Sequence, residues 1–269
     1  MSVNVRPAAV AGTFYPQSAA ILAREINEML CLSEKTEPTQ PKAIIVPHAG
    51  YIYSGVVAAK AYASLSAWRS VIQRVVLLGP THRVPVNGLA LPACIAFSTP
   101  LGTVPIDMEA VAAIKDLPQI VVSNLAHAQE HSLEVQIPFL QTVLGEFSLL
   151  PLAVGDTTPS MVAEVLERLW GEQETLIVVS SDLSHYLPYS EAKGIDGKTT
   201  HQIMALEATI HHQQACGATP VNGLLLAARH HGLRVHLLDQ RNSGATAGDK
   251  ARVVGYAAFA FYEDEKHGR

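Results

Sequence analysis

The chain has 269 residues, of which 48% are hydrophobic and 16% charged, and its formal net charge is −5. This length suits one large α/β domain with a sizeable core, and we expect a single domain over residues 1–269 because no linker divides the sequence. The sparse charge excludes a broadly basic surface, so we expect a small-molecule or peptide partner rather than nucleic acid or a membrane.

Short apolar runs rich in β-branched residues alternate with helical patterns along the chain. We predict strands near residues 43–46, 75–78, 148–154, 176–180, 234–238 and 253–261. Strands and helices that alternate at this spacing are typical of a three-layer α/β/α domain with a central, largely parallel or mixed sheet. The last run alternates less cleanly, which suggests an antiparallel edge strand.

Two helices have clear start or stop signals. Residues 18–30 carry an apolar stripe that follows Ser18, a suitable N-cap residue. Residues 219–232 have Thr219 as a capping residue, a proline directly after it, and Gly232 as a stop. We therefore expect a helix over each range.

A third helix is predicted over residues 130–145. Pro138 removes a backbone donor from it and predicts a kink, while Gly145 is suited to end it. Two polar segments are predicted to lie at the surface. Residues 34–42 are interpreted as a surface connection, and residues 263–269 as a solvated terminus.

The apolar runs, the first residues and the use of cysteine all favour a cytoplasmic protein. No apolar run approaches the roughly 20 residues that span a bilayer, and the first residues lack the pattern of a signal peptide. The three cysteines, Cys31, Cys94 and Cys216, form no paired pattern, so we expect no disulfide framework.

Titratable side chains follow three of the predicted strands. His48, His82, Asp182 and His185 each lie two to five residues beyond a predicted strand end. In open α/β sheets, ligands bind in the crevice beyond the carboxyl ends of the strands. A single histidine of this kind is usually an ordinary loop residue, but their recurrence predicts a shared site.

Two neutral imidazoles and one anionic ligand would leave coordination positions open for substrate or water. A hydrolytic zinc site and a non-haem iron site both fit that description, and residue types alone do not separate them.

Cys216, His131 and Glu130 are further candidates for this site. Cys216 precedes a predicted helix start, where the helix dipole favours a thiolate that could bind metal or act as a nucleophile. Its alternative interpretation is a small buried hydrophobic residue. His131 has Glu130 beside it, and a histidine ligand or general acid needs such a carboxylate to fix its tautomer. Glu134 is interpreted as an ordinary first-turn carboxylate.

Six segments resemble, in order and approximate spacing, the motifs of the Memo-like family. They are RPAAVAGTFYP (6–16), PHAGYIYSG (47–55), LLGPTHRVP (77–85), EHSLEVQIPFL (130–140), VVSSDLSHY (178–186) and CGATPVNGLL (216–225). The resemblance spans almost the whole chain.

The resemblance implies a fold similar to class III extradiol ring-cleaving dioxygenases, with metal-binding residues at one end of a central sheet. It implies His48, His82 and Cys216 as metal ligands. It also implies a catalytic group of His185 as acid/base, Asp182 beside it, and His131 lining the pocket.

One departure from the dioxygenases bears on the chemistry. Those enzymes complete their metal site with a carboxylate, whereas the resemblance implies that Cys216 occupies that place here. Sulfur is a softer donor, which shifts metal preference towards Cu, Zn or a differently tuned iron, so the resemblance does not extend to ring cleavage. Fe(II) remains the first expectation, with Cu or Zn as alternatives. Family members are often encoded beside a radical-SAM protein and a third protein, which are expected partners.

We expect a metal-dependent redox enzyme whose substrate the sequence does not reveal. The first rival is a peptide- or protein-binding module that keeps the pocket without turnover. The second is thiol-based or hydrolytic chemistry at Cys216 without metal.

Overall fold

The computed structural model describes residues 4–33, 39–246 and 248–263 and contains two sheets. The larger sheet consists of β2 (Pro41–Val46), β3 (Arg74–Pro80), β4 (Leu89–Leu91), β7 (Ile120–Val122), β8 (Ser148–Val154), β9 (Thr175–Ser180), β10 (His185–Leu187), β11 (Arg234–Asn242) and β12 (Val253–Tyr262). The smaller sheet consists of β1 (Val5–Arg6), β5 (Ala96–Thr99) and β6 (Gly102–Pro105). All six predicted strands are present.

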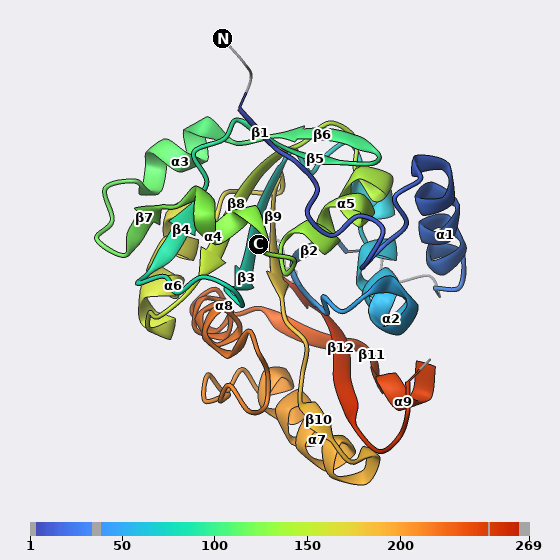
Figure 1. Ribbon diagram of the computed structural model, residues 1–269. Coiled ribbons are helices and arrows are strands. Elements are labelled where there is room, and N and C mark those ends of the chain that lie inside the picture. The colour runs from blue at the N-terminus through green and yellow to red at the C-terminus, as the bar shows by residue number, and fades with distance from the viewer. Residues whose placement is uncertain (1–3, 34–38, 247, 264–269) are drawn as a thin grey trace.

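The larger sheet is mixed, with the strand order β10-β12-β2-β9-β3-β8-β4-β7 and with β11 also paired to β12 (Figure 1). Its centre is parallel, because β2 pairs with β9, β9 with β3 and β3 with β8 in the same direction. The carboxyl ends of these four strands therefore meet at one edge of the sheet, and the residues that follow them are brought together there.

Helices cover both faces of this sheet (Figure 1). They are α1 (Ala19–Cys31), α2 (Tyr51–Ala63), α3 (Met108–Ile114), α4 (Asn124–Ala128), α5 (Ile137–Val143), α6 (Pro159–Leu169), α7 (Tyr189–Met204), α8 (Ala218–His230) and α9 (Ser243–Thr246), with 3-10 turns at Ser66–Trp68 and Glu134–Gln136. One buried core includes residues of α2 and α5, and a second includes residues of α6 and α8. The predicted three-layer arrangement is thus confirmed. Within the described residues, no helix is long and apolar enough to cross a bilayer.

The last strand is antiparallel as predicted, but its predicted place at the edge of the sheet is wrong. β12 lies between β2 and β11 and pairs with both. Its residues are buried on both faces, with Tyr256 and Ala258 in one core and Ala257 and Phe259 in the other. A strand covered on both sides has no polar face, which explains its weak alternation.

The single kinked helix predicted over residues 130–145 is also wrong. The structure has a 3-10 turn at Glu134–Gln136 and then α5, with Pro138 in its first turn. A proline has no N–H to donate and its ring excludes the preceding helical turn, so the regular helix starts here instead of bending. The residues before it are left free for other contacts.

The other two predicted helices are present with small differences. Ser18 occupies the N-cap position of α1, although its side chain makes no capping hydrogen bond. Gly217, and not Thr219, precedes α8, and Thr219 Oγ1 instead lies 3.3 Å from His212 Nε2. Gly232 ends the segment with a φ of +64°, a left-handed conformation that glycine adopts without strain.

Two predicted surface segments fall partly outside the described residues. Residues 34–38 and 264–269 are not described. Pro41 and Lys42, which were expected in the connection, are instead the buried first residues of β2.

A buried histidine in α4 makes stability sensitive to acid. His127 is 2% exposed, and burial lowers its pKa from 6.5 to about 4. Below pH 6.5 the unfolded chain takes up a proton that the folded protein excludes, so stability falls with pH until about pH 4. We expect His127→Gln to reduce the loss of unfolding free energy between pH 7.5 and 5 by about 2 kcal/mol, measured by urea denaturation. The exposed His201→Gln is the control; an equal reduction there would contradict the assignment.

Candidate metal centre

A cavity of about 990 Å³ opens at the carboxyl edge of the parallel strands. The six predicted site residues all line it: His48, His82, His131, Asp182, His185 and Cys216. His48 follows β2, His82 follows β3 and Asp182 follows β9, as predicted for residues just beyond the carboxyl ends of strands. The other three come from β10 and from the loops before the 3-10 turn at Glu134–Gln136 and before α8.

Hydrogen bonds fix the tautomer of His48, which is 2% exposed. Its Nδ1 lies 2.9 Å from Ser180 Oγ. That hydroxyl donates its only proton to Ser132 O and accepts from Gln136 Nε2. Ser180 Oγ can therefore only accept from His48, so Nδ1 carries the proton and Nε2 keeps a free lone pair.

One buried carboxylate lies beside both other imidazoles and orients that of His82. Glu130 Oε1 lies 2.9 Å from His82 Nδ1 and 3.3 Å from His131 Nδ1. The same carboxylate accepts the backbone N–H groups of His82, His131 and Ser132. The carboxylate accepts from Nδ1 of His82, so Nε2 of that ring is left to bind an ion, whereas Nδ1 of His131 makes no hydrogen bond.

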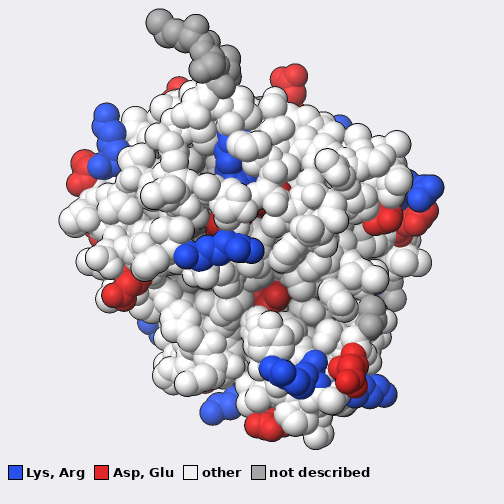
Figure 2. Space-filling view, in the orientation of Figure 1, with Lys and Arg blue, Asp and Glu red and all other residues white. Residues whose placement is uncertain are grey.

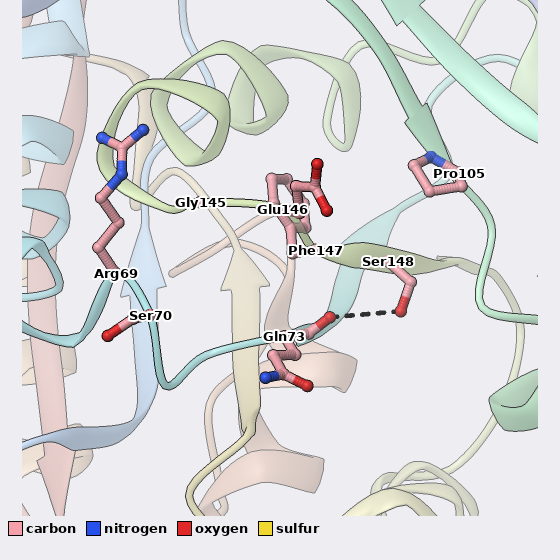
Figure 3. A pocket seen from close by; sticks show the side chains of 8 residues that line it. All are labelled: Arg69, Ser70, Gln73, Pro105, Gly145, Glu146, Phe147 and Ser148. Carbon is pink, nitrogen blue, oxygen red and sulfur yellow. Dashed lines mark hydrogen bonds between the residues drawn. The ribbon is translucent and has the colours of Figure 1, made fainter.

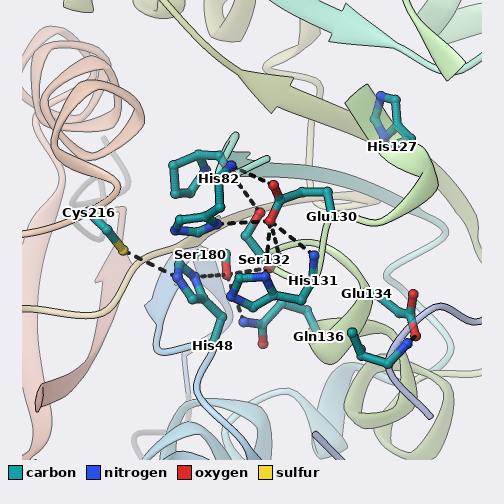
Figure 4. A network of polar contacts seen from close by, with 12 residues as sticks. His48, His82, His127, Glu130, His131, Ser132, Glu134, Gln136, Ser180 and Cys216 are labelled. Carbon is teal, nitrogen blue, oxygen red and sulfur yellow. Dashed lines mark hydrogen bonds and ion pairs between the residues drawn. The ribbon is translucent and has the colours of Figure 1, made fainter. Parts of the chain in front are cut away.

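The three rings face one another across the cavity (Figure 4). The ring of His48 lies 5.2 Å from that of His82 and 5.4 Å from that of His131, and the last two are 4.6 Å apart. One ring nitrogen of each lies within 4.8 Å of the others, so the three could hold a metal ion. Imidazoles backed by a carboxylate and a hydroxyl fit a transition metal well.

The charges at this cluster also suit a cation. Burial lowers the pKa of His48 well below its usual value and that of His131 to about 4, so both rings are neutral at pH 7. Burial alone would raise the pKa of Glu130, but hydrogen bonds from His82 and Ser132 outweigh it and hold that pKa at about 2. The neutral rings and the anion together leave a negative charge beside the candidate site.

Cys216 lies on the opposite side of His48 from Ser180 (Figure 4). Its Sγ is 3.2 Å from His48 Nε2, which is the unprotonated nitrogen. Burial, with a contribution from Asp182, raises the pKa of the thiol to about 12. The expectation that the α8 dipole favours a thiolate is therefore wrong for the metal-free protein, because burial outweighs it. The thiol donates to His48, and an ion bound there would take the place of its proton.

Asp182 and His185 are placed to hold or move a proton at the cavity wall. Asp182 Oδ1 accepts the backbone N–H of His48 at 2.7 Å, and burial raises the pKa of this carboxyl to about 7. His185 Nδ1 donates to Leu183 O at 2.8 Å, which leaves Nε2 as a proton acceptor. Burial lowers the pKa of His185, so its ring is neutral at pH 7.

Sequence reasoning missed the residues that support the cluster. Ser180 contacts Nδ1 of His48 and Gln136 contacts Ser180, and their signal was their place inside two of the quoted motifs. Phe14 was also missed: its ring lies 4.7 Å from that of His131. At the cavity mouth, Tyr186 has a φ of +59° and contacts Arg252, whose guanidinium carbon is 5.2 Å from its ring. Such strain in a non-glycine residue is typical of functional sites.

Another hollow lies at the amino end of β3 and β8 and has less chemistry. It is lined by Arg69, Ser70, Gln73, Pro105, Gly145, Glu146, Phe147 and Ser148 (Figure 3). No histidine or cysteine lines it, and Ser148 is engaged with Gln73 O. The face seen in Figure 2 is mostly uncharged, and its Lys and Arg side chains are scattered, with no basic patch on it.

Comparison with known proteins gives one consistent result. The sequence profile of the family described as Memo-like protein matches residues 6–260. A MEMO1 family protein of Aquifex aeolicus is 38% identical over 96% of this chain and 100% of its own length. One from Archaeoglobus fulgidus is 35% identical over 94% of this chain and 97% of its own. The crystal structure of an uncharacterized protein from Escherichia coli K12 superimposes on this chain with a TM-score of 0.54. The match covers 81% of this chain and 98% of that protein at 12% sequence identity, so the two share the fold.

Proposed function

The chain belongs to the Memo-like family, and from this premise we propose that it is a metal-dependent redox enzyme related to non-haem iron dioxygenases. His48, His82 and Cys216 would hold the ion, with His131 as the competing third ligand. The observation that carries the proposal is the hydrogen bonding of Nδ1 on His48 and His82, which leaves Nε2 of both rings for a ligand. Cys216 Sγ lies against one of these nitrogens.

Fe(II) is the first candidate ion, with Cu or Zn as alternatives, and it would supply Lewis-acid and one-electron chemistry when bound. The protein's own groups would handle protons. His185 is neutral and presents Nε2 as a base, while Asp182 has a pKa of about 7 and can hold or release a proton near neutrality. Phe14 and His131 would position a small-molecule or peptide substrate in the cavity.

Metal content tests the proposal directly. The wild type, purified anaerobically and supplied with Fe(II), should bind about one ion per chain. We expect His48→Ala and His82→Ala to weaken binding at least about 100-fold, because each removes a ligand that a neighbour has oriented. His201→Ala is the control, since His201 is exposed and does not line the cavity, and it should bind normally.

Cys216→Ser and His131→Ala identify the third ligand, because only the true ligand should show a loss as large as that of His48→Ala. A wild type that binds neither Fe(II), Cu nor Zn would refute the proposal and favour a binding module without turnover. A Cys216→Ser protein with full metal content and no activity would favour thiol chemistry instead.

A further inference from the structure

Glu167, His230 and His231 form a second cluster with metal-ligand chemistry, away from the cavity. Glu167 lies in α6, His230 ends α8 and His231 follows it. One ligand atom of each lies within 4.8 Å of the other two, and all three residues are exposed. Cys216 precedes the other end of α8, which has 13 residues, so this cluster and the cavity are roughly 20 Å apart.

The ring of His231 is held in place before any ion binds. It stacks on Trp170 with ring centres 3.8 Å apart and an angle of 6° between the planes. Trp170 is only 9% exposed, and Lys42 Nζ lies 5.6 Å from its ring. A ligand whose orientation is already fixed loses little conformational entropy when it binds an ion.

The spacing of two donor atoms matches adjacent ligands of one ion. Nitrogen and oxygen donors about 2.1 Å from an ion are about 3.0 Å apart at the right angles of a tetragonal Ni²⁺ site and about 3.4 Å apart in a tetrahedral Zn²⁺ site. His231 Nε2 and Glu167 Oε2 are 2.9 Å apart. An ordinary hydrogen bond gives the same distance, so the deciding feature is His230. The ring of His230 lies 5.1 Å from that of His231 and adds a second imidazole, which a salt bridge between His231 and Glu167 alone would not require.

We propose that Glu167, His230 and His231 bind a divalent transition metal such as Zn²⁺ or Ni²⁺ at the protein surface. Imidazole and carboxylate donors suit these ions. The site lies at the carboxyl end of α8, where the helix dipole attracts cations. The bound ion joins α6 to α8 and stabilises the folded chain by mass action. This site is independent of the cavity and of the function proposed for it.

Trp170 provides a local reporter for the test. The chain has two tryptophans, so Trp68→Phe leaves Trp170 as the single emitter. In this variant, carrying also His82→Ala to disable the cavity, Ni²⁺ should quench Trp170 fluorescence with a saturating curve. Adding Glu167→Gln or His230→Asn should raise the midpoint at least tenfold while leaving the His231–Trp170 stack intact. His211→Asn, an exposed histidine elsewhere, should leave the midpoint unchanged.

A thermal measurement complements the titration. In the His82→Ala background, Zn²⁺ should raise Tm, and the rise should vanish in Glu167→Gln/His230→Asn. Quenching that does not saturate below millimolar Ni²⁺, equal midpoints in all variants, or a Tm rise that survives the double substitution would each overturn the site. Glu167, His230 and His211 are exposed, whereas Trp68 is partly buried, so far-ultraviolet circular dichroism should confirm that each variant folds.

Discussion

Glu130→Gln is expected to weaken metal binding at the cavity by about 10- to 100-fold, as loss of an outer-shell partner typically does. Glu130 is 1% exposed and accepts from both Nδ1 and the backbone N–H of His82. A glutamine of the same shape turns one oxygen into a donor, which faces another donor in this site. His82 then loses the charge and the geometry that present its Nε2 to an ion, and His131 loses the neighbouring charge.

Competition with a chelator of known affinity measures this effect. Ser180→Ala is the informative comparison. Ser180 is a neutral partner of His48, so its loss should weaken metal binding less than the loss of Glu130, which is charged and also accepts three backbone N–H groups. Glu146→Gln, at the hollow on the opposite edge of the sheet, should leave affinity unchanged. If Glu130→Gln binds metal as tightly as the wild type while remaining folded, the carboxylate is not part of the centre.

The location of the candidate site could be predicted from sequence because it depends on a general property of parallel sheets. His48, His82 and Asp182 each follow a buried apolar run, and the carboxyl ends of such strands meet at one edge. No knowledge of side-chain packing was needed for that step. The order of the strands and the internal place of β12 depend on long-range pairing, which local patterns do not report.

The segment around residues 130–136 shows why the remaining details could not be predicted. A helical pattern there suggested that Glu134 is an ordinary first-turn carboxylate, but Pro138 delays the helix, and the freed turn directs Glu134 inward and Glu130 to His82 as well as His131. Both roles depend on partners far away in sequence. Cys216 presents the same difficulty, since its burial, and not its place before α8, determines its protonation.

Glu134→Gln is expected to lower the free energy of unfolding by about 3–5 kcal/mol, the cost of leaving a buried charge unpaired. The Glu134 side chain is fully buried and lies 2.6 Å from Arg6, which is itself 6% exposed. It also accepts the hydroxyl of Tyr15 and the backbone N–H of Val10. These contacts hold the N-terminal segment that presents Phe14 to His131 in the cavity. The loss would be a large fraction of the stability of an ordinary domain.

Guanidinium denaturation, followed by fluorescence and circular dichroism together, measures this loss. Glu109→Gln is a matched control: Glu109 also pairs with an arginine, at 3.8 Å from Arg74, but its side chain is 94% exposed and its loss should have no measurable effect. Glu134→Gln leaves the charge of Arg6 unpaired, and Arg6→Met removes that charge. The double variant should therefore be more stable than the sum of the two single losses predicts. Additive losses, or a shift for Glu134→Gln no larger than that for Glu109→Gln, would mean that the buried pair does not hold the segment. In that case the position of Phe14 beside His131 must depend on the backbone contact between Phe14 O and Tyr51 N instead.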